Sequence, residues 1–161
     1  MKRLLVLLCV LALVFVGCGD DEPTTDTGAP ADESSAPADE GGGEVVVTAV
    51  EYEFDLADTY PAGTTTFSLQ NDGEEPHFIE FVELTEDAPA LDELLKMPEK
   101  EIGQYFMAQH KIPTAKPGEM AKKSAEIDLA SGARYAYVCF IPAKDGTPHA
   151  FLGMAGEFTV E

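Results

Sequence analysis

Residues 135–160 read YAYVCFIPAKDGTPHAFLGMAGEFTV, and this stretch decides how the rest of the 161-residue chain is interpreted. An apolar strand ends at Cys139, and a second strand is predicted at 157–160. The loop between them contains His149 and Met154, together with two prolines and an Asp-Gly turn. A cysteine, a histidine and a methionine therefore lie on one loop between two strands.

Upstream of this stretch, apolar residues mostly alternate with polar ones, which is the pattern of half-buried β-strands. The alternation is strict in 50–56 and predicts one strand with Val50 on the same face as Phe54. A later strand is expected to point Phe67 and Leu69 inward. Short strands with frequent turns predict an all-β antiparallel sandwich or barrel. The strands are expected at 50–56, 64–69, 78–84, 124–129, 134–139 and 157–160.

A short helical insertion is predicted around 86–110, where the spacing of apolar residues changes. Residues 90–97 have apolar side chains at helical intervals, and Pro98 is a favourable start for a second helix that continues to His110. We expect this insertion to pack on the sandwich.

Four residues supply the donor atoms that copper prefers. Cys139 is the one cysteine after residue 18, so it has no partner for an internal disulfide. His77 stands at the start of a predicted strand, and His149 and Met154 follow Cys139 on its loop. A thiolate, two imidazoles and a weak thioether are the ligands of electron-transfer copper sites. Taken singly, each has an ordinary alternative: a buried cysteine, a core methionine, or a histidine that bonds a carbonyl.

The order of these residues resembles the cupredoxins, the plastocyanin and azurin family of type 1 copper proteins. The resemblance runs from Asn71 through Pro76-His77 to Tyr135–Cys139, Pro142, His149, Met154-Ala155-Gly156 and Phe158-Thr159-Val160. It implies a Greek-key β-sandwich over 45–161 that is not an enzyme and transfers electrons through one type 1 copper. The implied ligands are His77, Cys139, His149 and Met154. It also implies that the edge of His149 reaches the surface through an apolar rim at 150–153, where a redox partner would dock.

Other functions are weighed against electron transfer. Nine residues separate Cys139 from His149, a length closer to the type 1 domain of copper nitrite reductases than to plastocyanins. Those enzymes need several more histidines, and only His110 remains, so the loop length does not imply their activity. A copper carrier or chaperone that delivers copper to an extracytoplasmic oxidase is the main alternative, and a metal-free recognition domain is another. A copper(I) site made of His110, Met107 and Met120 competes with a simpler role for His110 at a helix C-terminus.

The N-terminal region predicts export and attachment to a membrane. Residues 1–18 have a basic start and 13 uncharged apolar residues, which suits a signal peptide and is too short to span a bilayer. The ending Phe15-Val16-Gly17-Cys18 resembles a bacterial lipobox and implies lipidation of Cys18; the alternative is an ordinary cleaved signal. Residues 19–44 contain no aliphatic residue larger than alanine and are expected to form a disordered acidic tether.

The charge of the chain limits its partners. It has 10 Lys and Arg against 30 Asp and Glu, a net charge of −20, which argues against nucleic acid. After subtraction of two basic residues in 1–18 and nine acidic ones in 19–44, residues 45–161 carry −13. We expect a lipid-anchored protein on the periplasmic or outer side of a bacterial membrane. Its expected partner is a cytochrome or oxidase with a basic docking surface.

Overall fold

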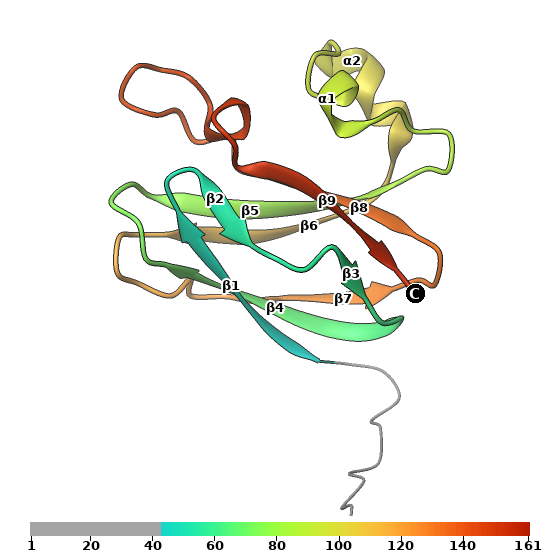
Figure 1. The fold of residues 1–161 in the computed structure, drawn as a ribbon, viewed down its shortest axis with the longest axis horizontal. Coiled ribbons are helices and arrows are strands. Elements are labelled where there is room, and N and C mark those ends of the chain that lie inside the picture. Colours follow the sequence, from blue (N-terminus) through green and yellow to red (C-terminus); the bar gives the residue numbers. More distant parts are fainter. Residues whose placement is uncertain (1–42) are drawn as a thin grey trace, which may run out of the picture. The chain divides into compact units, whose positions relative to one another are not determined.

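The structure is a computed structural model that describes residues 43–161 (Figure 1). The predicted signal peptide, the lipidation of Cys18 and nearly all of the predicted tether (19–44) lie outside the described residues. Within the described part, no helix has the length and apolar character needed to cross a membrane.

Two β-sheets pack face to face and enclose the core (Figure 1). One sheet has the strand order β2-β1-β4-β7 and the other has the order β3-β9-β8-β5-β6. The prediction of an all-β sandwich is therefore confirmed. The strands are β1 (Glu44–Val50), β2 (Glu53–Asp55), β3 (Thr59–Tyr60), β4 (Gly63–Asn71), β5 (His77–Leu84), β6 (Phe106–Ala115), β7 (Ala125–Leu129), β8 (Arg134–Val138) and β9 (Ala155–Val160).

These segments form strands because alternate side chains are buried between the two sheets. In β4 every second residue is buried, including Phe67 and Leu69, which are fully inaccessible as predicted. Aromatic rings fill the space between the sheets: Phe67 lies 4.7 Å from Phe81, and Phe158 stacks on Tyr135 at 5.1 Å between ring centroids. Contacts of this kind add to the free energy gained from burying the rings themselves.

The sheets contain two parallel pairs, β1 with β4 and β3 with β9, and the remaining pairs are antiparallel. The prediction of a single strand over 50–56 is wrong, because the chain turns at Glu51 and Tyr52, and β2 folds back on β1. Val50 is consequently 39% exposed, whereas Phe54 is buried. The turn places Glu51 at the end of the sandwich where β5 begins.

The helical insertion is shorter than predicted. It consists of α1 (Leu91–Leu94), α2 (Glu99–Ile102) and a short 3-10 helix, η1 (Gly103–Tyr105). The remainder of the predicted second helix is instead the first half of β6. This strand pairs with β5, so hydrogen bonds between residues distant in sequence override the local helical spacing. His110 therefore lies in mid-strand opposite Phe81 and not at a helix end.

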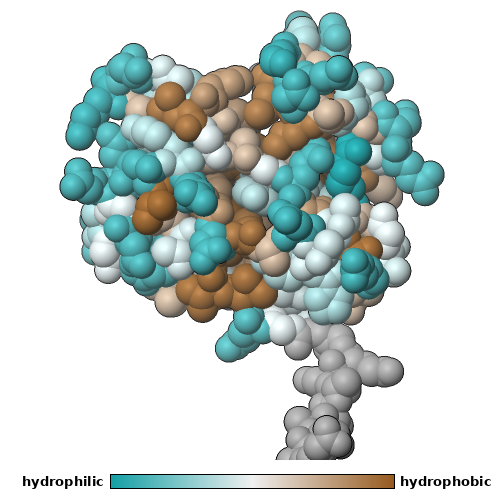
Figure 2. All heavy atoms as spheres, in the orientation of Figure 1, coloured by the Kyte–Doolittle hydropathy of each residue, from teal (hydrophilic) through white to brown (hydrophobic). Residues whose placement is uncertain are grey.

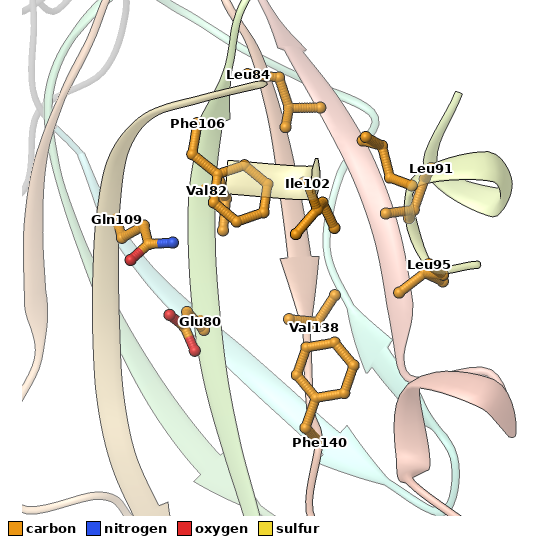
Figure 3. A pocket seen from close by; sticks show the side chains of 12 residues that line it. Glu80, Val82, Leu84, Leu91, Leu95, Ile102, Phe106, Gln109, Val138 and Phe140 are labelled. Atoms are coloured by element: carbon orange, nitrogen blue, oxygen red, sulfur yellow. The ribbon is translucent and has the colours of Figure 1, made fainter. Parts of the chain in front are cut away.

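The insertion covers the outer face of the five-stranded sheet. Leu94 is 1% exposed and packs with Val82, Leu84 and Ala136 of the sheet. An apolar cavity of about 90 Å³ remains between them, and Figure 3 shows side chains of the insertion and of the sheet lining it. In Figure 2 apolar residues likewise gather in the hollow beside the insertion.

Candidate metal centre

Three predicted ligands converge at one end of the sandwich. His77 begins β5, Cys139 directly follows β8, and His149 begins the 3-10 helix η2 (His149–Phe151). Their ligand atoms all lie within 4.8 Å of one another, and all three side chains are fully buried. The two Nδ1 atoms are 3.1 Å apart, and Cys139 Sγ is 3.7 Å from His149 Nδ1.

The outer nitrogens of both histidines contact carboxylates. His77 Nε2 lies 2.9 Å from Glu51 Oε1, and His149 Nε2 lies 3.1 Å from Glu75 Oε2. A carboxylate accepts hydrogen bonds only, so each Nε2 carries the proton and donates it. An imidazole whose one proton is on Nε2 has a lone pair on Nδ1, and the two Nδ1 atoms face each other across 3.1 Å.

A metal cation satisfies this arrangement. Ligand nitrogens about 2.0 Å from a metal in a trigonal plane are roughly 3.5 Å apart, and a longer metal–sulfur bond places sulfur slightly farther away. The separations of 3.1 Å and 3.7 Å agree with that geometry. Two imidazoles and one thiolate in a plane are the equatorial ligands of a type 1 copper site.

Met154 is held next to these ligands by the backbone. The N–H of Cys139 donates to the Met154 carbonyl, and the N–H of Met154 donates to the His149 carbonyl, each at 3.0 Å. The side chain of Met154 is fully buried. Its thioether completes the donor set of a type 1 copper site, and the prediction of one such copper is supported by this chemistry.

The charge state of the site follows from burial. Burial lowers the pKa of His77, and this outweighs its hydrogen bond to Glu51, so the imidazole is neutral. Burial raises the pKa of the Cys139 thiol, which hydrogen bonds from the N–H groups of Ile141 and Phe78 only partly offset. A bound metal would deprotonate this thiol.

The loop from Cys139 to His149 is fixed by its own hydrogen bonds. The N–H of His149 donates to the carbonyl of Ile141 at 2.9 Å, and the N–H of Ala150 donates to the carbonyl of Cys139 at 2.7 Å. Gly153 has φ +130°, and a Cβ there would lie 2.7 Å from the carbonyl oxygen of Tyr52. Glycine is therefore required where this loop meets the turn after β1.

Asn71 supports the opposite side of the site. Its fully buried side chain donates to the carbonyls of Glu75 and Ala115 and accepts from the N–H of Gly73. These bonds shape the loop that leads into His77. The resemblance to cupredoxins includes Asn71 but does not predict this role for it.

Glu51, Glu75 and Tyr52 were not identified from the sequence. The ring of Tyr52 lies 4.8 Å from that of His149, and its hydroxyl donates to Glu75. Glu51 occupies a position that the alternating pattern assigns to solvent. Burial raises the pKa of Glu51, but hydrogen bonds from the N–H groups of Glu74 and Glu75 and from His77 outweigh it and bring the pKa to about 2.

The expectation about the exposed edge of His149 needs correction. His149 is fully buried beneath Glu75 and Tyr52, so its edge does not reach the surface, although Phe151 and Leu152 of the expected rim are exposed. His110 is not among the clustered donors of residues 43–161. Met107 is 66% exposed and lies at an irregularity of β6 between Phe106 and Ala108, whereas His110 pairs with Phe81.

Comparison with known proteins identifies the fold. No family model and no curated protein matches the chain. Auracyanin A, a "blue" copper protein of Chloroflexus aurantiacus, matches with a TM-score of 0.51 and 17% identity over 75% of this chain and 100% of its own. Auracyanin from Roseiflexus castenholzii has a TM-score of 0.49 and 19% identity over 73% and 96%. Copper nitrite reductase from Nitrosomonas europaea has a TM-score of 0.43 and 20% identity over 74% and 41%.

The chain therefore has the cupredoxin fold, as predicted. At one end of the sandwich it places His77, Cys139 and His149 together and Met154 beside them, which is the donor set of a type 1 copper site.

Proposed function

We propose that this protein is a type 1 copper electron carrier. The observation that supports this function is the buried cluster of His77, Cys139 and His149, in which the two Nδ1 atoms lie 3.1 Å apart and the sulfur lies 3.7 Å from one of them. When bound, copper supplies one-electron chemistry by changing between Cu(II) and Cu(I). A donor set held rigidly by the fold keeps reorganisation small when an electron is gained or lost.

Burial of the ligands favours electron transfer over copper delivery. A carrier that hands copper to a partner needs donors that the partner reaches, whereas His77, Cys139 and His149 are each 0% exposed. The same burial argues against an enzyme, because a catalytic metal keeps an open position for its substrate. The cluster is also the one group of three such donors in residues 43–161.

We further propose that the protein is lipid-anchored through Cys18 on the extracytoplasmic side of a bacterial membrane, and that a cytochrome or oxidase with a basic surface is its partner. Phe151 is 54% exposed and Leu152 is 39% exposed, and they stand two and three residues after His149. Together with the net charge of −13 over 45–161, they would provide an apolar contact within an acidic surrounding.

Copper(II) titration of the purified chain tests the assignment. We expect an intense visible band from charge transfer between the Cys139 thiolate and copper. Cys139→Ser should abolish it, and His110→Ala should retain it. Absence of the band in the unmodified chain would refute the type 1 site. Loss of the band in His110→Ala would show that a ligand is misassigned.

A second measurement separates electron transfer from delivery. A reversible one-electron voltammogram, with copper retained by the protein, would support the role of electron carrier. Rapid loss of Cu(I) to a competing chelator, at a rate that follows the chelator concentration, would instead support delivery of the metal.

A further inference from the structure

Two glutamates hold the ligand histidines from the side opposite the metal cluster. Glu51 belongs to the turn after β1, and Glu75 belongs to the loop before β5. Their carboxylates contact the Nε2 atoms of His77 and His149 at 2.9 Å and 3.1 Å. Each imidazole thus has one nitrogen in the ligand cluster and the other against a carboxylate.

Glu51 is fixed independently of any metal. Its carboxylate accepts the N–H of Glu74 at 2.9 Å and the N–H of Glu75 at 2.6 Å. A Cβ on Gly73 would lie 2.5 Å from Glu51 Oε1, so the loop approaches the carboxylate closely where it lacks a side chain. The position of His77 Nε2 is therefore dictated by a carboxylate that two backbone N–H groups already hold.

The carboxylate of Glu75 next to His149 has only a weak cationic partner. Its side chain is 13% exposed and accepts the Tyr52 hydroxyl at 3.4 Å. The nearest cation, Lys144 Nζ, is 3.7 Å away but is 89% exposed, and such a pair is screened by water. In the described residues neither carboxylate is paired with a buried Lys or Arg, so each places negative charge one imidazole away from the metal position.

We propose that Glu51 and Glu75 are positioning residues that set the redox balance of the copper centre. Their hydrogen bonds direct both Nδ1 lone pairs inward, and their charges stabilise Cu(II), the more highly charged state, relative to Cu(I). This inference rests on the proposed function. It gives this electron carrier a lower reduction potential than the same copper site would have without the carboxylates.

Isosteric variants measure the effect of charge. Glu51→Gln and Glu75→Gln each keep an acceptor oxygen and remove one negative charge. The matched control is Glu74→Gln, which makes the same change at the exposed side chain next to Glu75 in the loop before β5. At a fixed ambient potential, spectroelectrochemistry of the copper-loaded chain should show the Cu(I) to Cu(II) ratio raised at least tenfold by each of the first two variants. A tenfold change corresponds to about 59 mV for one electron.

The control should change the ratio less than threefold. Potentials of Glu51→Gln and Glu75→Gln that coincide with that of Glu74→Gln would overturn the proposal. If Glu51→Gln fails to fold because its loop bonds are lost, Glu75→Gln decides, since no backbone N–H donates to Glu75 in the described structure.

A readout without copper tests the positioning directly. Nitrogen-15 NMR of the metal-free chain should show the ring protons of His77 and His149 on Nε2. Glu75→Ala should give His149 a mixture of tautomers while His77 is unchanged. Protons on Nδ1 in the unmodified chain would refute the inference. A chain that never develops the copper band refutes the proposed function instead, so the two failures are distinguishable.

Discussion

Replacement of Asn71 by alanine should destabilise the domain at the loop that leads into His77. The variant removes three hydrogen bonds: two from Nδ2, to the carbonyls of Glu75 at 2.8 Å and Ala115 at 3.0 Å, and one accepted from the N–H of Gly73 at 2.9 Å. A buried polar group left without a partner costs about 1–3 kcal/mol. The bond to Ala115 is fully buried and the other two are partly buried, so we expect a total loss of about 3 kcal/mol.

Thermal unfolding of the metal-free chain, followed by circular dichroism, measures this loss. For a domain of this size, about 3 kcal/mol corresponds to a fall in Tm of roughly 12 °C. Gln70→Ala is the matched control: it removes one exposed bond, to Asp72 at 2.9 Å, and should change stability by less than about 0.5 kcal/mol. A loss below about 1 kcal/mol in Asn71→Ala would refute the reasoning that the site loop depends on this side chain.

Three further predictions follow from burial and backbone geometry. Gly153→Ala should lower the free energy of unfolding by at least about 2 kcal/mol, because the new Cβ meets the Tyr52 carbonyl. Gly146→Ala is the control: its φ is +89°, but a Cβ there meets open space, so the loss should be about 1 kcal/mol. Urea unfolding of the two variants measures both losses. Leu94→Ala should lose about 2–4 kcal/mol yet leave the copper band intact, and loss of the band would show that the insertion supports the site. Burial and the charge of Glu83 raise the pKa of Tyr135 to about 12, so the folded state keeps a proton that the unfolded chain releases near pH 10. The free energy of unfolding should therefore fall as pH rises from 10 to 12, and less steeply in Tyr135→Phe.

Much of the sandwich could be predicted because its strands have one buried face. In β7 the alternation of Ala125, Ile127 and Leu129 with charged residues is enough to assign a strand. The failure at β6 has a physical cause. Its apolar residues fit helical spacing locally. Only pairing with β5, whose partner residues are more than 20 positions away in sequence, makes the strand more stable than the helix.

The site divides in the same way. The ligands were predictable because cysteine, histidine and methionine are chemically distinctive and stand in a recognisable order. Glu51 and Glu75 were not, since acidic residues are common in this chain and both positions suit solvent. Their role exists only because the turn after β1 brings Glu51 against residues that follow it by 23 to 26 positions.

The direction of β1 also determines which end of the sandwich faces a partner. The end that holds His77, Cys139 and His149 is called the copper end. The strand starts at Glu44 and, at about 3.3 Å per residue, runs roughly 20 Å before Glu51 reaches His77. Any segment attached ahead of residue 43 therefore joins the domain a full strand length from the ligands. If that segment leads to a lipid, the protein is held by the end opposite its metal, and the copper end is left free for a partner to approach.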